Sequence, residues 1–177
     1  MLPRGWVELL GYAMNWPALI IGLVTAERLV ELIISNRNAE KLYKRGGHEA
    51  GRNHYPLIVI LHICWLITVY AAAPHRAAPN IPLILIYLVL QAGRVWVIQS
   101  LGSYWTTRII NVPKAPLVHR GPYRFMKHPN YAIVIAEIAI LPLAFGEINA
   151  AVIFSVLNLL ILSWRVFVEN RALDSRN

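Results

Sequence analysis

The chain has 177 residues, of which 57% are hydrophobic and only 15% are charged, and its mean hydropathy is +0.49. Soluble domains carry charge on about a quarter of their residues, so this composition excludes a disordered chain and argues against a water-soluble globule. Lys and Arg number 17 against 9 Asp and Glu, a formal net charge of +8. Such an excess can indicate nucleic-acid binding, but here the basic residues lie between long apolar runs, as in membrane proteins. The composition therefore predicts an integral membrane protein with no nucleic-acid partner.

Four apolar regions predict five membrane-spanning helices, because one span needs about 20 mostly apolar residues. The first three predicted spans run from about 14 to 35, from 55 to 73 and from 81 to about 100. The last region, from 131 to about 168, is too long for one span and breaks at Phe145-Gly146-Glu147. It therefore predicts two helices joined by a tight turn.

A polar stretch rich in turn and basic residues, about 101–130, separates the third span from this helical hairpin. Pro129 suits the first turn of the short helix that follows. The sequence contains no repeat and no linker that would mark a second unit. We therefore expect an all-α fold, a single integral membrane domain over residues 1–177 with five helices, a cytoplasmic loop and a C-terminal helical hairpin.

The distribution of Lys and Arg among the connecting segments predicts the orientation. The segments after the first, third and fifth spans contain Arg37, Lys41, Lys44, Arg45, Arg52, Arg108, Lys114, Arg120, Arg124, Lys127, Arg171 and Arg176. The segments on the opposite side contain Arg4 and Arg76. Because basic loops stay in the cytoplasm, we expect a protein of the bacterial inner membrane with its N-terminus outside and its C-terminus cytoplasmic.

Ionisable residues inside the apolar segments are costly in hydrocarbon and indicate either function or pairing. They are Glu27, Arg28, Glu31, His62, Arg94, Glu137, Arg165 and Glu169. The charges in the second half of the first region are either interfacial or buried against other helices. Glu137 lies deep enough to need a partner, and the sequence leaves Arg94 and Arg165 as alternatives. A lone histidine such as His62 is more often structural than a ligand.

The last predicted helix carries a polar stripe. Arg165 and Glu169 are four residues apart and so share a face, and Asn158 lies close to whole helical turns before both. A local ion pair between Arg165 and Glu169 is the simplest interpretation. A stripe of this kind in a helix otherwise built from apolar residues favours functional use.

The densest polar cluster is the segment 118–131, which precedes and opens the fourth helix. Gly121-Pro122 indicates a turn, and Asn130 and Tyr131 occupy an opening helical turn, whose free N–H groups attract anionic groups. Contact with lipid headgroups would explain the basic residues of this segment. It would not explain the spacing of the Gly, Pro, Tyr, His, Pro and Tyr residues.

Three of these features together resemble the isoprenylcysteine carboxyl methyltransferase family, integral membrane enzymes that use S-adenosylmethionine (SAM). They are Gly121-Pro122-Tyr123, the run Lys127-His128-Pro129-Asn130-Tyr131, and Arg165 four residues before Glu169. The resemblance covers about residues 90 to 175. In the opening half, Gly51-Arg52-Asn53-His54-Tyr55-Pro56 followed by His62 looks more like bacterial members that methylate lipid-like polyketides.

The resemblance implies a role for each matching residue. Arg165 would be catalytic and face the methyl acceptor, and no metal would be involved. The cofactor-binding residues would be Leu117, Val118, Tyr123, His128, Pro129, Asn130, Tyr131 and Glu169, with the strand-like stretch 115–118 supporting the adenosine through its backbone. Lys127 stands where the family often has arginine, and the C-terminal acidic run of eukaryotic members is absent.

The chemistry of SAM agrees with this set. The chain contains no G-x-G-x-x-G, so a conventional dinucleotide-binding domain is excluded. The methionyl carboxylate suits a cation such as Arg108 or His128, tyrosine faces suit the sulfonium, and Glu169 suits ribose hydroxyls or the ammonium group. The acceptor would be a prenylated or other lipophilic molecule reaching the site among membrane lipids.

The acceptor itself stays open between a carboxylate and a phenol or pyrone hydroxyl. A carboxylate needs no general base, whereas a hydroxyl does unless it ionises unaided. The candidate bases are His54, His62, His128 and Glu137. Rival functions are a phospholipid N-methyltransferase, a haem-carrying anchor that would need two axial histidines, and a transporter.

Overall fold

A computed structural model of the chain describes residues 15–52, 55–74, 78–113, 115 and 118–174. This part of the chain contains five α-helices and confirms the all-α fold class. The helices are α2 (Trp16–Lys44), α3 (Tyr55–Ala72), α4 (Ile81–Leu101), α5 (Pro129–Ala144) and α6 (Ile148–Asp174). Leu117 and His54, which have predicted site roles, lie outside the described residues, as do Arg4, Asn53, Arg76, Lys114 and Arg176.

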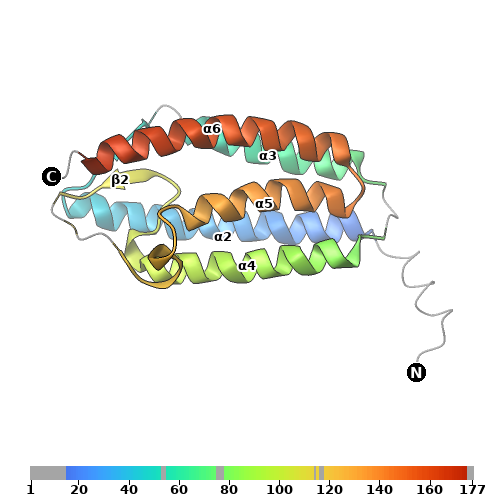
Figure 1. Cartoon of the computed structure of the whole chain (residues 1–177), viewed down its shortest axis with the longest axis horizontal. Coiled ribbons are helices and arrows are strands. Elements are labelled where there is room, and N and C mark those ends of the chain that lie inside the picture. The colour runs from blue at the N-terminus through green and yellow to red at the C-terminus, as the bar shows by residue number, and fades with distance from the viewer. Residues whose placement is uncertain (1–14, 53–54, 75–77, 114, 116–117, 175–177) are drawn as a thin grey trace, which may run out of the picture.

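The helices run lengthwise in one bundle (Figure 1). α5 packs against both α4 and α6, α6 packs against α3, and α2 also contacts α3. Trp65, Val69, Ile138 and Leu141 are among the side chains buried where these helices meet. Large apolar side chains cover the outside of the bundle, and Val89 is 70% exposed, which is the surface that lipid would solvate.

Three described segments are long and apolar enough to cross a membrane: Tyr55–Ala72, Ile81–Tyr104 and Ile148–Arg171. α5 is apolar but shorter. α2 is not among these candidates and carries Glu27, Arg28 and Glu31 in its middle. The chain is therefore a helical membrane protein, and the count of five spans remains a prediction.

The helix boundaries follow local signals. The side chains of Asn15 and Asn80 accept hydrogen bonds from the amides three residues on, at 3.1 and 3.2 Å, and so cap α2 and α4. The predicted break between the last two helices is confirmed. Gly146 lies there with a φ of +81°, a conformation that glycine adopts without steric cost.

The first helix is longer than its predicted span. α2 continues past residue 35 to Lys44 because Ala39 and Leu42 bury their side chains against the rest of the protein. Asn38 is buried on the same stretch, and its Nδ2 donates to the backbone carbonyls of Gly102 at 3.2 Å and Trp105 at 2.9 Å. The end of α2 is thereby tied to the chain that follows α4.

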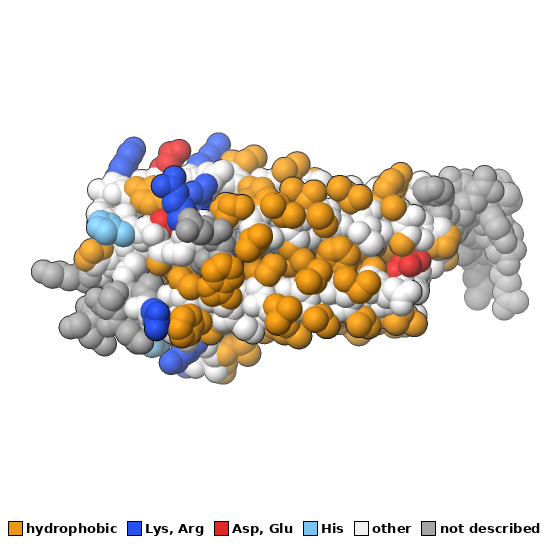
Figure 2. Space-filling view, turned by 90° about the horizontal axis from the view of Figure 1, so that it is seen from above, with side chains coloured by type: hydrophobic (Ala, Val, Ile, Leu, Met, Phe, Trp, Pro, Cys, Tyr) orange, Lys and Arg blue, Asp and Glu red, His pale blue; other side chains and the backbone are white. Residues whose placement is uncertain are grey.

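A small antiparallel ribbon was not predicted. β1 (His48–Ala50) pairs with β2 (Ile109–Asn111), with His48 opposite Asn111. Two 3₁₀ turns, η2 (Gly102–Tyr104) and η3 (Gly121–Arg124), lie at the same end of the bundle, which we call the ribbon end. Lys and Arg side chains gather at this end in Figure 2, while its placement in the cytoplasm remains a prediction.

Asn38→Ala is expected to lower the free energy of unfolding by about 1–3 kcal/mol, because two backbone carbonyls lose their buried donor. Thermal unfolding in detergent measures the change. Asn36→Ala, an exposed position on the same helix, is the matched control and should leave the unfolding temperature unchanged. Equal stability of the two variants would contradict the assignment.

Candidate active site

Tyr131 joins the beginning of α5 to the end of α6. Its hydroxyl donates to Glu169 Oε2 at 2.5 Å and accepts from Arg165 Nε at 2.8 Å. The guanidinium of Arg165 also lies 5.7 Å from the centre of the Tyr131 ring. Arg165 and Glu169 therefore meet through a shared tyrosine and not as the simple local ion pair that their spacing suggests.

His128 completes this cluster. Its ring stacks on the ring of Tyr131, with centroids 5.2 Å apart and planes 12° apart, and its Nδ1 lies 3.5 Å from Glu169 Oε2. Pro129 is buried beside it and begins α5. The structure thus brings together Arg165, His128, Tyr131 and Glu169, which we call the Tyr131 cluster.

Arg165 has a second anchor that the sequence did not reveal. Its Nη2 donates to the backbone carbonyl of Thr107 at 2.6 Å. Thr107 is held in turn by Ser35 of α2, whose Oγ accepts from the Thr107 amide at 2.9 Å, and by the Tyr55 hydroxyl at 3.2 Å. These contacts use a carbonyl and hydroxyls that form no recognisable motif, so no pattern in the sequence could have found them.

Tyr123 lies in η3, just before α5. Gly121 opens this turn with a φ of +59°, and a Cβ at that position would collide with Ser100 Oγ. Burial raises the pKa of Tyr123, and the negative charge of Glu169 raises it further. The Tyr123 phenol is therefore neutral, and its environment includes the carboxylate of the Tyr131 cluster.

Two of the other predicted cofactor residues can be placed. Asn130 is half-buried in the first turn of α5, and its Oδ1 has no hydrogen-bond partner among the described residues. Val118 is half-buried in irregular backbone. The strand-like prediction for 115–118 is not seen at Ala115 or Val118, because the chain forms its strand earlier, at Ile109–Asn111.

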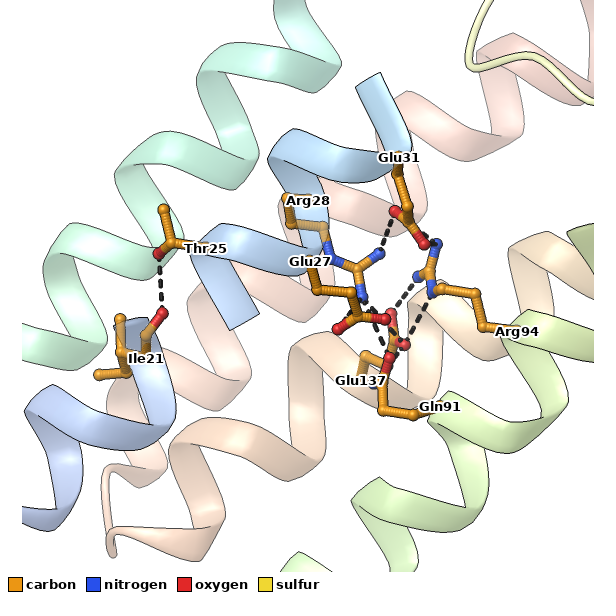
Figure 3. Close-up of polar contacts among 8 residues, drawn as sticks. All are labelled: Ile21, Thr25, Glu27, Arg28, Glu31, Gln91, Arg94 and Glu137. Carbon is orange, nitrogen blue, oxygen red and sulfur yellow. Dashed lines mark hydrogen bonds and ion pairs between the residues drawn. The ribbon is translucent and has the colours of Figure 1, made fainter. Parts of the chain in front are cut away.

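The charges inside the helices form a buried network (Figure 3). Glu137 Oε1 of α5 accepts from Arg94 Nε at 3.0 Å, from Gln91 Nε2 at 2.8 Å and from Arg28 Nη2 at 3.3 Å. A further ion pair joins Arg94 Nη2 to Glu137 Oε2. Among the two alternatives for the partner of Glu137, the structure therefore selects Arg94, assisted by Arg28.

The same network answers the question about α2. Glu31 Oε2 lies 2.8 Å from Arg28 Nη1, and the Glu31 carboxylate also lies 3.4 Å from Arg94 Nη1. Glu31, Arg94 and Glu137 are all buried. Arg28 and Glu31 of α2 are therefore paired with α4 and α5 inside the bundle, whereas Glu27 is half-buried and lies 3.5 Å from Arg28 of its own helix.

The remaining polar residues lie apart from the Tyr131 cluster. His62 Nδ1 lies 2.8 Å from the Ile58 carbonyl, and the His62 ring meets the Trp65 ring edge-on, as in a structural histidine. Asn158 is 1% exposed, and its Nδ2 has no partner within the described chain. No group of three or more His, Cys, Asp or Glu side chains that could hold a metal ion occurs in that part either.

Arg108, one of the two cations expected to face the cofactor carboxylate, does not join the Tyr131 cluster in the described contacts. It pairs with Glu49 of the ribbon, Nη1 to Oε2 at 3.3 Å, and its guanidinium lies 4.9 Å from the centre of the Tyr55 ring. Of the two alternatives, His128 is the one that the structure places in the cluster.

A helical membrane protein with a Tyr-Arg-Glu cluster at one end of its bundle is the class that the fold and the site define. The sequence profile of the isoprenylcysteine carboxyl methyltransferase (ICMT) family matches residues 83–175, which include the whole Tyr131 cluster. The chain belongs to this family and is a membrane methyltransferase.

Two relatives match over most of their length. The chain is 36% identical over 165 residues to the uncharacterised protein YpbQ of Bacillus subtilis, covering 91% of this chain and 97% of that protein. It is 25% identical over 157 residues to an uncharacterised protein of Haemophilus influenzae, covering 85% and 91%. No solved structure matches the chain.

Proposed function

We propose that this methyltransferase uses SAM to methylate an oxygen of a lipophilic acceptor within the membrane. The observation that carries the proposal is the Tyr131 hydroxyl, which joins Arg165 to Glu169 inside the region that matches the ICMT family. Members of that family are SAM-dependent in general. Arg165 serves the acceptor in this proposal, and Glu169 serves the cofactor.

The residues of the site fit SAM. Asn130 presents a buried oxygen that has no donor among the described residues, which suits an N–H or O–H group of the cofactor. The stacked rings of His128 and Tyr131 offer aromatic faces to a sulfonium, a contact worth about 0.5–2 kcal/mol. The carboxylate of Glu169 is partly exposed and can accept from ribose hydroxyls or the ammonium group.

Residues of the loop before α5 are further candidates for contact with SAM. Tyr123, kept neutral by burial, and Val118 flank the Tyr131 cluster in sequence, and Leu117 remains assigned on the resemblance alone. Pro129 begins α5, whose first turn has no side-chain cap. The amides of Tyr131 and Ala132 donate to the His128 carbonyl, which leaves the Asn130 amide and the positive end of the helix dipole to favour an anionic group such as the methionyl carboxylate.

The chain's contribution to catalysis is orientation. When bound, SAM would supply an electrophilic methyl group for the acceptor oxygen and would itself become a neutral thioether. Arg165 donates through Nε to Tyr131 and through Nη2 to Thr107, which leaves Nη1 without a hydrogen-bond partner among the described residues. Held on two sides, this guanidinium can direct Nη1 at the acceptor oxygen and align it for transfer.

The surroundings of each candidate general base support one choice for a hydroxyl acceptor. Glu137 already accepts from three donors and belongs to the buried network. His62 lies about two helical turns along α3 from Tyr55, which contacts Thr107. His128 lies in the Tyr131 cluster with Glu169 beside it. We therefore assign His128 to take the hydroxyl proton, and a carboxylate acceptor would need no base.

The location of the site supports the predicted orientation. The Tyr131 cluster lies at the ribbon end, where the Lys and Arg side chains gather in Figure 2. The positive-inside rule assigns such an end to the cytoplasm, where SAM is made. In this proposal SAM enters from the cytoplasm of a bacterium, and the acceptor enters sideways from the inner membrane.

Calorimetry of SAM and S-adenosylhomocysteine binding to the detergent-purified protein tests the proposal. We expect micromolar binding that Glu169→Ala weakens roughly 10- to 100-fold, because a charged hydrogen bond contributes about 1.5–3 kcal/mol. Glu40→Ala, an exposed glutamate of α2 near the ribbon end, is the matched control and should bind as the wild type does. Tyr131→Phe should behave like Glu169→Ala.

Either of two results would overturn the cofactor assignment. One is wild-type affinity in Glu169→Ala. The other is a folded wild-type protein that binds neither ligand, which would favour a transporter or an anchor. The remaining alternative is a phospholipid N-methyltransferase. Incubation with labelled SAM and phosphatidylethanolamine tests it, because a labelled lipid product would identify that activity.

A further inference from the structure

A polar pocket of about 370 Å³ lies at the ribbon end beside the proposed active site. Tyr43 of α2, Glu49 of β1, Arg52 and Arg108 line it. The proposed methyl transfer assigns no role to any of these four side chains. The charges of these side chains, and the position of Arg108 next to Thr107, suggest a role in binding.

The pocket carries an excess of positive charge. Glu49 accepts from the Tyr43 hydroxyl at 2.8 Å and pairs with Arg108 at 3.3 Å. With Arg52, the lining contains one carboxylate and two guanidiniums. Arg108 Nε is buried and has no hydrogen-bond partner among the described residues. Arg52 is exposed, with no ion pair in the described part of the chain. Donors left over on two guanidiniums suit an anionic oxygen group.

Tyr43 adds a neutral donor to this lining. Burial, followed by the hydrogen bond to Glu49, raises the pKa of the Tyr43 phenol. The phenol therefore keeps its proton at neutral pH and adds no negative charge. The neutral phenol therefore leaves the pocket with the charges of one carboxylate and two guanidiniums.

The pocket and the Tyr131 cluster are separated by a single residue. Arg108 follows Thr107, so their Cα atoms are about 3.8 Å apart, and the Thr107 carbonyl accepts from Arg165. Tyr55 spans the same step, with its hydroxyl on Thr107 Oγ1 and its ring facing the Arg108 guanidinium. The carbonyl that anchors Arg165 therefore belongs to the residue directly before Arg108 of the pocket.

The sequence origin of the pocket favours the acceptor over the cofactor as its occupant. Tyr43, Glu49 and Arg52 precede residue 83 and lie outside the region that matches the family, whereas every residue proposed to hold SAM lies inside it. SAM is the cofactor of the family in general, so residues outside the matching region are better suited to bind the acceptor, which differs between members. We propose that the pocket binds a second, anionic oxygen group of the methyl acceptor, and that Arg52 and Arg108 determine acceptor specificity. This inference rests on the proposed function.

The experiment compares two simple amphiphiles, decanoate and uncharged 1-decanol, by titrating the tryptophan fluorescence of the full-length protein in zwitterionic nanodiscs. We expect the wild type to bind decanoate roughly tenfold or more tightly than decanol. The double variant Arg52→Gln/Arg108→Gln should lose that preference while its SAM affinity, measured by calorimetry, stays unchanged. Arg37→Gln, an exposed arginine of α2, is the matched control and should keep the preference.

Three results would overturn the proposal. They are equal binding of the two amphiphiles by the wild type, an unchanged preference in the double variant, and a fall in SAM affinity in the double variant, which would assign the pocket to the cofactor. If the double variant does not fold, the single variants Arg52→Gln and Arg108→Lys are titrated in its place. The titration needs no SAM, so a wild type that fails to bind SAM would overturn the proposed function and still report on the pocket.

Discussion

Arg165→Ala is expected to lower methyl transfer by roughly 10²–10³-fold, the scale found when one oriented donor at a reaction centre is removed. Arg165 is 6% exposed, and its guanidinium is anchored at Tyr131 and Thr107, so no neighbouring side chain can take its place. SAM affinity should stay within about twofold of wild type, because Tyr131 keeps its hydrogen bond to Glu169. Turnover with a membrane lipid extract and labelled SAM, alongside calorimetry, measures the two quantities separately.

Two further variants sharpen this test. Arg165→Lys keeps the charge but cannot reproduce two anchored N–H groups together with a free one, so it should lose most of the turnover as well. Arg171→Ala, six residues later on α6 and exposed, is the matched control and should retain wild-type rates. Full activity in Arg165→Ala would show that the acceptor is held elsewhere.

Glu137→Ala is expected to destabilise the protein by about 3–5 kcal/mol, the cost of leaving a buried charge without its partner. Arg94 loses its closest carboxylate, and Arg28 and Gln91 each lose an acceptor. The temperature of unfolding in detergent, followed by circular dichroism, should fall far below that of the wild type. Glu147→Ala, at the turn between α5 and α6, removes a carboxylate outside the described network and should have little effect.

A second variant separates lost pairing from lost packing. Arg94→Met combined with Glu137→Leu removes both charges and keeps apolar volume, so it should recover part of the stability that Glu137→Ala loses. A double variant as unstable as Glu137→Ala would indicate that shape, and not charge pairing, holds α4 to α5. A fully stable Glu137→Ala would contradict the role of the network altogether.

Much of the helical fold could be predicted because its signals are local. The apolar runs of α3 and α4 end within a residue or two of the predicted spans, and Gly146 marks the turn that divides the last region. The extension of α2 to Lys44 could not be predicted from hydropathy, because its polar residues resemble a loop and its burial depends on distant partners. The ribbon joins His48 to Asn111 through three-residue strands too short to produce a pattern.

The candidate site shows the same division. Arg165, Glu169, His128 and Tyr131 were selected through motifs at separate places in the chain, and only the packing of α5 on α6 shows that one hydroxyl connects them. Thr107 has no sequence signal because it contacts Arg165 through its backbone carbonyl, which every residue possesses. The partner of Glu137 also required geometry, since Arg94 and Arg165 were equivalent candidates in sequence.

The buried network also bears on how the protein is made. α2 leaves the ribosome before α4 and α5, yet its Glu31 is paired with Arg94, 63 residues later, and its Arg28 with Glu137, 109 residues later. A charged residue at the centre of an inserted helix costs about 2.5–3.5 kcal/mol on insertion scales. In the predicted five-span arrangement, the first of these helices to be synthesised would therefore lack partners for its charges until α5 has been made. Biogenesis of this protein should depend on retaining α2 at the insertion machinery until α5 has emerged.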